Sequence, residues 1–250
     1  MSDLIGQTAL ITGASTGIGA ASALALARAG ADVGINYCRS RKAAEEVLKS
    51  VEALGRRAAL FECDVCDPDQ VSAMVAAFVK QFRRIDILFA NAGGLIKRCP
   101  ITRMPDALWH RVVALNFDSV FYTVRAALRP MLKAKRGNII VNASVAARSG
   151  GGGGAVHYAA AKGALVTFVK GLSKEVAANS IRVNAVAPGV TLTPFHDKAT
   201  EPERMARFRD SSPIGKLGAP DDIARAVVWL AGETEGFITG ETLYIAGGGM

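Results

Sequence analysis

Short apolar segments alternate with longer amphipathic segments along almost the whole chain. The apolar runs are rich in β-branched residues, which is typical of strands buried on both faces, and helical periodicity dominates between them. We therefore expect strands at 8–12, 31–37, 57–63, 85–90, 137–144, 180–187 and 238–245. Helices are expected at 20–29, 41–54, 68–82, 105–129, 155–178 and 220–230.

This alternation predicts an α/β fold: a doubly wound (Rossmann) seven-stranded parallel sheet with helices on both faces. Residues 1–250 are expected to form a single domain, since no linker or internal repeat interrupts the pattern. The stretch 195–212 is charged, contains Met205 and Phe208 and has no firm period. We interpret about 191–215 as a substrate lid.

Composition limits the possible classes of protein. Half of the residues are hydrophobic, but no uninterrupted apolar run is long enough to span a membrane, and M-S-D-L-I-G-Q lacks the features of a cleavable leader. We expect a cytoplasmic protein without a membrane partner. Cys63 and Cys66 form a C-x-x-C, but no second pair or histidine cluster accompanies them, so no metal site is expected.

The formal net charge of +8 raises the question of a nucleic-acid partner. The basic residues are scattered in small groups and aromatic residues do not interleave with them, which argues against nucleic-acid binding. A solvated surface explains most of this charge, and it would also attract anionic ligands such as phosphorylated cofactors.

A glycine-rich motif, T-G-A-S-T-G-I-G at 12–19, follows the first predicted strand and opens the first predicted helix. Glycines let the backbone approach a pyrophosphate closely, and the helix N-terminus offers unpaired amides. The spacing of Gly13, Gly17 and Gly19 is G-x-x-x-G-x-G rather than G-x-G-x-x-G. The motif predicts a dinucleotide site.

Tyr158 and Lys162 stand four residues apart in a predicted helix, so they share one face. A nearby ammonium lowers the pKa of a phenol, which would make the tyrosine a usable acid or base near neutral pH. Taken alone, Y-A-A-A-K also fits one turn of a surface helix.

Four motifs in order give the chain a family resemblance. T-G-A-S-T-G-I-G, N-A-G at 91–93, Ser144 before Y-A-A-A-K, and P-G at 188–189 resemble the short-chain dehydrogenase/reductase family over essentially the whole chain. The resemblance implies a dinucleotide-binding oxidoreductase that interconverts a carbonyl and a secondary alcohol with NAD(P)(H).

The resemblance also implies catalytic roles. Tyr158 would be the acid/base, Ser144 would hydrogen-bond the carbonyl oxygen, and Lys162 would lower the pKa of the tyrosine and bind the ribose hydroxyls. Asn116 would brace the lysine through a water, with a capped or exposed asparagine as the alternative. The implied cofactor-binding residues are Gly13, Ser15, Thr16, Gly17, Ile18, Gly19, Arg39, Ser40, Asp64, Val65, Asn91, Ala92, Gly93, Pro188, Gly189, Thr191 and Thr193.

The end of the second predicted strand favours NADP(H) over NAD(H). A carboxylate there would bind the ribose 2′-hydroxyl, but Arg39 and Ser40 are present instead, and a guanidinium pairs well with a 2′-phosphate. Two observations keep the cofactor preference open. Arg39 could simply face solvent without binding a phosphate, and Thr16 stands where many NADP-preferring relatives carry a basic residue.

Three features near the predicted site have no fixed role. Gly150–Gly154 is expected to be a flexible turn with no fixed side-chain contacts, bordering the substrate pocket. His157 is expected at the surface or an interface rather than in catalysis, because it points away from Tyr158. Ala246 replaces the aspartate that relatives commonly carry before the closing glycines, which leaves that contact in doubt.

The substrate and partners stay open. The motifs resemble the branch of 3-oxoacyl-carrier-protein reductases and of sugar or polyol dehydrogenases, and a non-catalytic dinucleotide-binding regulator is an alternative of another class. Lys135 and Arg136 are candidates for docking an acyl carrier protein, although a solvated helix end explains them equally. The resemblance implies a homotetramer, with interfaces on the helices at about 105–130 and 157–178 and on the last strand and helix.

Overall fold

The computed structural model describes residues 3–194, 202–232 and 236–249. Its centre is a seven-stranded parallel sheet with strand order β3-β2-β1-β4-β5-β6-β7. The predicted doubly wound α/β fold is confirmed. The strands are β1 (Thr8–Ile11), β2 (Asp32–Tyr37), β3 (Ala58–Glu62), β4 (Ile87–Ala90), β5 (Gly137–Asn142), β6 (Ile181–Pro188) and β7 (Thr242–Ile245).

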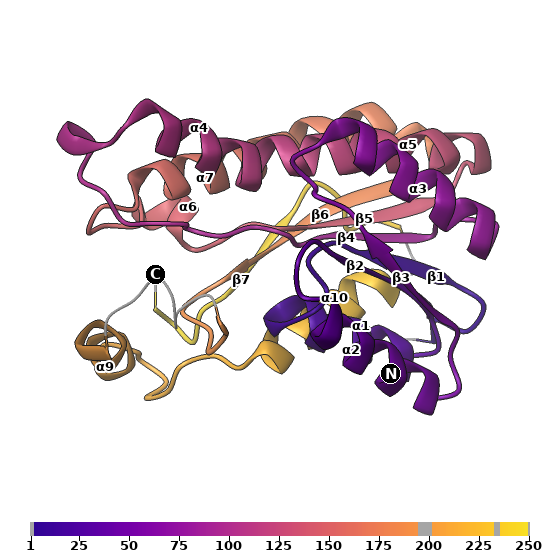
Figure 1. Cartoon of the computed structure of the whole chain (residues 1–250), viewed down its shortest axis with the longest axis horizontal. Coiled ribbons are helices and arrows are strands. Elements are labelled where there is room, and N and C mark those ends of the chain that lie inside the picture. Colours follow the sequence, from indigo (N-terminus) through magenta and orange to yellow (C-terminus); the bar gives the residue numbers. More distant parts are fainter. Residues whose placement is uncertain (1–2, 195–201, 233–235, 250) are drawn as a thin grey trace.

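Helices cover both faces of this sheet (Figure 1). One layer contains α1 (Gly17–Arg28), α2 (Arg41–Ala53) and α10 (Pro220–Gly232). The other contains α3 (Pro68–Phe82), α4 (Asp106–Val113), α5 (Ser119–Ala134) and α7 (Val156–Val176). The short α6 (Ala146–Ser149) and α9 (Pro202–Asp210) lie at the same end of the molecule as the start of α7 (Figure 1).

The two layers explain why the strands are apolar throughout. Along β4, Leu88 and Ala90 join one buried cluster, whereas Ile87 and Phe89 join the other. Ile139 and Ile140 of β5 divide in the same way. Successive side chains of a strand point to opposite faces, so a strand covered on both sides needs an unbroken apolar run.

The strand order reverses direction at β1, which pairs with both β2 and β4. In an open parallel sheet, ligands bind in the crevice beyond the carboxyl ends of the strands at this switch point. The glycine-rich turn follows β1 and N-A-G follows β4, so the fold places both motifs at that crevice.

Several helix boundaries differ from expectation. The helix expected at 105–129 is interrupted by a π-helical turn, Ala114–Asp118, and continues past Pro130 to Ala134. Met131 is fully buried beyond the proline, and this burial offsets the hydrogen bond that proline removes. The loop expected after Ser144 contains α6, and α7 ends at Val176, before a 3₁₀ turn at Ala177–Asn179.

Within the described residues, no helix is long and apolar enough to cross a membrane.

Candidate active site

The glycine-rich turn leaves β1 and opens α1. Gly13 and Gly17 have φ values of 62° and 56°, in the left-handed region that favours glycine. At Gly19, a Cβ would overlap the carbonyl oxygen of Gly13 and lie 2.7 Å from Asn91 Nδ2. The first turn of α1 therefore packs directly on the glycine-rich turn. Ser15, Thr16 and Ile18 are all at least partly exposed there.

Polar side chains from neighbouring strands hold this turn. The backbone amides of Asn91 and Ala92 donate to Thr12 Oγ1 at 2.9 and 3.0 Å, and Asn91 Nδ2 donates to the Thr12 carbonyl at 2.9 Å. Gly13 N donates to Asn36 Oδ1 at 3.0 Å. These bonds tie the turn to both neighbours of β1.

Asn36 and Asn142 support the site, although no sequence motif marks them. Asn36 is buried at the end of β2, and Asn142 Nδ2 donates to Asn91 Oδ1 at 2.9 Å. A signal was present: each asparagine interrupts an apolar strand, and a buried amide requires hydrogen-bond partners. Which backbone or side chain provides them depends on strand order, so the sequence did not identify the partners.

The crevice fits a nicotinamide dinucleotide. Thr16 precedes α1 without making a side-chain capping bond, and the first turn of the helix contains no acidic residue. A helix start with uncapped amides and a positive dipole end suits a pyrophosphate.

The residues expected around the adenosine lie at the carboxyl ends of β2 and β3. Arg39 and Ser40 are exposed directly after β2. Asp64 Oδ1 accepts a hydrogen bond from Cys66 N at 3.0 Å in an exposed turn, and Val65 is buried. The structure thus brings these residues to the edge that carries the glycine-rich turn.

The turn after β6 approaches the same crevice. Thr191 Oγ1 donates to the Gly189 carbonyl at 3.1 Å, and Thr193 Oγ1 donates to the Thr191 carbonyl at 3.3 Å. A Cβ at Gly17 would lie 3.2 Å from the Thr193 methyl, so this turn contacts the glycine-rich turn.

Ala246 fills the space beside this turn. A Cβ at Gly189 would lie 2.9 Å from Ala246 Cα, and Gly189 N donates to the Ile245 carbonyl at 2.8 Å. The C-terminal segment therefore supports the Pro188–Gly189 turn through backbone contact, without an aspartate.

Ser144 and Tyr158 come together from the end of β5 and the first turn of α7. Their hydroxyls share a hydrogen bond, and Ser144 Oγ also accepts one from Ala146 N at 3.1 Å. Burial raises the pKa of Tyr158, while the bond with Ser144 acts in the opposite direction.

Lys162 is 2 % exposed, and its Nζ donates to the Asn142 carbonyl at 2.6 Å. Its Nζ lies 5.8 Å from the centre of the Tyr158 ring. Burial lowers the pKa of Lys162 to about 7. Here the structure differs from expectation: the pKa of Tyr158 is raised rather than lowered, because burial disfavours charge on both groups. The buried lysine also excludes the alternative of a surface helix turn.

Asn116 lies in the π-helical turn and is fully buried, so the alternative of an exposed asparagine is wrong. Its Nδ2 donates to the carbonyls of Gly94 and Val112 at 2.7 and 2.9 Å, and its Oδ1 accepts from Gly94 N at 2.9 Å. A Cβ at Gly93 would lie 2.8 Å from Asn116 Oδ1 and 3.2 Å from Lys162 Nζ. Asn116 and Lys162 therefore meet over the same glycine.

Comparison with known proteins agrees with this arrangement. A family described as enoyl-(acyl carrier protein) reductase matches residues 13–249. The chain belongs to the short-chain dehydrogenase/reductase family. It is accordingly an NAD(P)-dependent oxidoreductase that interconverts carbonyls and alcohols.

Relatives within the short-chain dehydrogenases/reductases act on different substrates. The chain is 37% identical over 249 residues to a 3-oxoacyl-[acyl-carrier-protein] reductase of Synechocystis, covering 99% of this chain and 98% of that protein. It is 35% identical over 249 residues to an L-rhamnose 1-dehydrogenase (NAD(P)(+)) of Sphingomonas, covering 98% and 96%.

A solved structure extends the range of substrates. The 7α-hydroxysteroid dehydrogenase complexed with NADH and 7-oxo glycochenodeoxycholic acid superposes with a TM-score of 0.94 at 32% identity, covering 99% of this chain and 96% of that one.

His157 is fully buried in this short-chain dehydrogenase/reductase, so the surface or interface expectation was wrong. Its Nε2 donates to the Lys97 carbonyl at 3.0 Å, and burial lowers its pKa. Its partner Lys97 lies in the loop at 94–104. His157 thereby attaches this loop to the start of α7.

The glycine run, Gly150–Gly154, is also not the unattached turn that was expected. All five residues have φ between 50° and 78°, and Gly154 O accepts from Cys99 N at 2.9 Å. Arg98 Nη1 donates to the carbonyls of Gly152 and Gly153 at 3.2 and 3.3 Å. Because glycine has no Cβ atom, donors from other segments can approach these carbonyls closely. The sequence pattern did not reveal these contacts.

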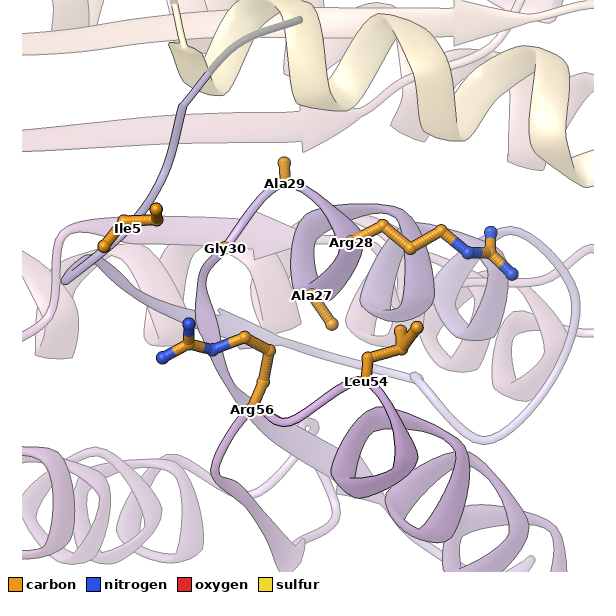
Figure 2. A pocket seen from close by; sticks show the side chains of 7 residues that line it. All are labelled: Ile5, Ala27, Arg28, Ala29, Gly30, Leu54 and Arg56. Carbon is orange, nitrogen blue, oxygen red and sulfur yellow. The ribbon is translucent and has the colours of Figure 1, made fainter.

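A separate hollow of about 330 Å³ lies at the opposite edge of the sheet (Figure 2). It adjoins the end of α1 and the segments that enter β1, β2 and β3. Arg28 and Arg56 extend in opposite directions from it (Figure 2). Because it lies at the amino ends of these strands, it is not part of the candidate active site.

Proposed function

We propose that this enzyme reduces a ketone to a secondary alcohol with NADP(H), and that Tyr158 is the proton donor. The observation that carries the proposal is the convergence of Ser144, Tyr158 and Lys162 on one side of the dinucleotide crevice. The cofactor, when bound, supplies the hydride.

The chain's own residues handle the proton. Tyr158 keeps its proton near neutral pH because burial raises its pKa, so it can donate to an alkoxide oxygen. Ser144 is positioned to hydrogen-bond the same oxygen. Lys162 would bind the nicotinamide ribose hydroxyls, and Asn116 would brace the lysine through a water, since both lie against Gly93.

The leading substrate is a 3-oxoacyl thioester, as in the Synechocystis relative, with a sugar or polyol as the alternative. A non-catalytic regulator, the alternative of another class, is disfavoured by the family match. The paired Ser144 and Tyr158 hydroxyls argue against it, because a protein that only binds a dinucleotide has no use for them.

Replacing Tyr158 with phenylalanine tests the catalytic role. Loss of the proton donor should lower kcat about 10²- to 10⁴-fold, with little change in NADPH affinity, because the ring remains. The measurement is NADPH oxidation at 340 nm with ketones, sugars and 3-oxoacyl thioesters, together with NADPH binding. Near wild-type turnover by Tyr158→Phe would refute the assignment. Tight NADPH binding without turnover of any substrate would favour the regulator.

The NADP(H) preference rests on the exposed Arg39 and on the absence of a carboxylate from 37–40. Arg39→Glu should reduce the NADPH-to-NADH ratio of kcat/KM about tenfold or more, since a charged hydrogen bond to the 2′-phosphate is replaced by repulsion. Lys49→Glu, at an exposed position on α2, is the control. Equal ratios in wild type and Arg39→Glu would contradict the preference.

The position of Lys135 and Arg136 gives no support to docking of an acyl carrier protein there. These residues precede the amino end of β5, whereas Ser144 follows its carboxyl end. Arg136 Nε also lies 3.4 Å from Asp86 Oδ1. The expected homotetramer and cytoplasmic location stay predictions. The lid at about 191–215 also stays a prediction: α9 belongs to it, and 195–201 lie outside the described residues.

A further inference from the structure

Two of the segments that border the proposed substrate pocket carry only positive charge. Residues 94–104 contain Lys97, Arg98 and Arg103 and no carboxylate. Residues 144–157, which connect Ser144 to the start of α7, contain Arg148 and no carboxylate. A pocket wall built from these segments favours an anionic ligand.

Arg98 extends from the first of these segments across the second. Its Nη1 donates to the carbonyls of Gly152 and Gly153, which stand six and five residues before Tyr158. The side chain is only partly exposed. These bonds hold the guanidinium beside the glycine run rather than in open solvent.

Arg204 reaches the same point from α9. A Cβ at Gly153 would overlap its guanidinium, so this side chain packs directly on the glycine run. Its Cζ also lies 5.9 Å from the centre of the Phe208 ring, one turn later in α9. Glycine at 153 is required both for φ of 54° and for this close approach.

The two guanidiniums therefore converge on one site from different elements. Burial lowers the pKa of Arg98, and the positive charge of Arg204 lowers it further. Two guanidiniums held at one place can both donate to the same oxyanion, and each of them attracts it.

We propose that Arg98 and Arg204 form an oxyanion subsite that binds a carboxylate or phosphate group of the substrate. The guanidinium forks suit the planar, bidentate recognition of such groups. The subsite is distinct from the start of α1 and the end of β2, where the phosphates of the cofactor would bind. It rests on the proposed function, since it assigns a class of substrate to the same pocket.

Matched substrates test the subsite. 3-Oxobutanoate and 4-oxopentanoate are compared with their methyl esters, which replace the charged carboxylate with a neutral group one methyl larger. 3-Oxobutanoyl-CoA is compared with the N-acetylcysteamine thioester, which lacks the phosphates. We expect the charged member of at least one pair to have the higher kcat/KM. A preference for the acids would identify a carboxylate as the recognised group, and a preference for the CoA thioester would identify a phosphate.

Arg204→Gln should lower kcat/KM for that charged substrate about 10- to 100-fold and leave its neutral counterpart within about twofold. Arg98→Lys should lose part of the same preference, because it keeps the charge but not the fork. Arg207→Gln in α9 and Arg103→Gln in the 94–104 segment remove equal charge at exposed positions and serve as controls.

Equal kcat/KM within every pair, or an equal loss on both members in Arg204→Gln, would overturn the subsite while leaving the proposed reaction intact. Absence of turnover with every substrate would instead refute the proposed function. In that case the acids and esters are compared as ligands of the NADPH-loaded protein. A Tm increase with the charged member alone, abolished in Arg204→Gln, would support the subsite, and no such increase would refute it.

Discussion

Burial makes the position of Lys162 costly to maintain. Its side chain is almost completely buried, and the Asn142 carbonyl is a neutral acceptor that does not neutralise an ammonium. The pKa of about 7 is the direct result of this burial. A group that destabilises the fold but adjoins both Tyr158 and Gly93 is more readily explained by catalysis than by packing.

The stability of Lys162→Met should therefore depend on pH. Below about pH 7 the wild type must bury a charged lysine, so the variant should be more stable, by up to about 5 kcal/mol. Above about pH 10.5 the lysine is neutral in both folded and unfolded states, and the difference should vanish. Urea unfolding from pH 6 to 10.5 measures this trend.

Lys170→Met is the matched control, because Lys170 is exposed on the same helix. It reports the effect of the same substitution at a solvent-exposed position. A Lys162→Met variant less stable than wild type at pH 6 would show that Lys162 gains more from its contacts than it loses by burial.

At the scale of elements, α1 and the glycine-rich turn form one unit. The contact between Gly19 and Gly13 sets how closely the helix follows the turn, and Asn91 fixes the turn to β4. The same principle acts at the glycine run, where missing side chains allow Arg98 and Arg204 to approach.

Gly19→Ala should separate α1 from its turn. The added methyl group requires a backbone shift that costs about 1–3 kcal/mol, so NADPH binding should weaken roughly tenfold or more. Fluorescence titration with NADPH measures this. Gly171→Ala in α7 is the control: nothing lies within 4 Å of its Cβ position, and it should stabilise the protein by about 0.5–1 kcal/mol. Wild-type NADPH affinity in Gly19→Ala would contradict the close-packing argument.

At the scale of the whole molecule, large apolar side chains remain exposed on two faces. Trp229 of α10 and Leu243 of β7 are 49% and 38% exposed, and Phe237, in the segment that connects these two elements, is 95% exposed. On the opposite layer, Phe121 and Leu132 of α5 are 39% and 40% exposed. Two separate apolar faces are what a tetramer with two kinds of interface requires.

Introducing charge on one face should dissociate only one kind of interface. Trp229→Glu combined with Leu243→Glu should convert the expected tetramer into dimers, because a buried unpaired carboxylate destabilises an interface. Sedimentation velocity measures the assembly. Leu54→Glu is the control, since Leu54 is exposed outside both faces. A monomeric wild type would refute the tetramer.

The sequence by itself determined the fold class and the chemistry. Seven apolar runs determined seven strands, because a strand covered on both faces cannot contain many polar residues. The motifs placed Gly13, Ser144, Tyr158 and Lys162 in elements whose ends meet at the crevice. These features are local in the chain, so local patterns reveal them.

Only the tertiary structure decided what depends on contacts between distant segments. The burial of His157 and Lys162, the amides of Asn36 and Asn142 against the cofactor crevice, and the π-helical turn around Asn116 all depend on partners far away in sequence. The meeting of Arg98 and Arg204 over the glycine run is of the same kind. Burial determines the pKa of a side chain, and strand order determines which residues surround it. A local sequence pattern contains neither kind of information.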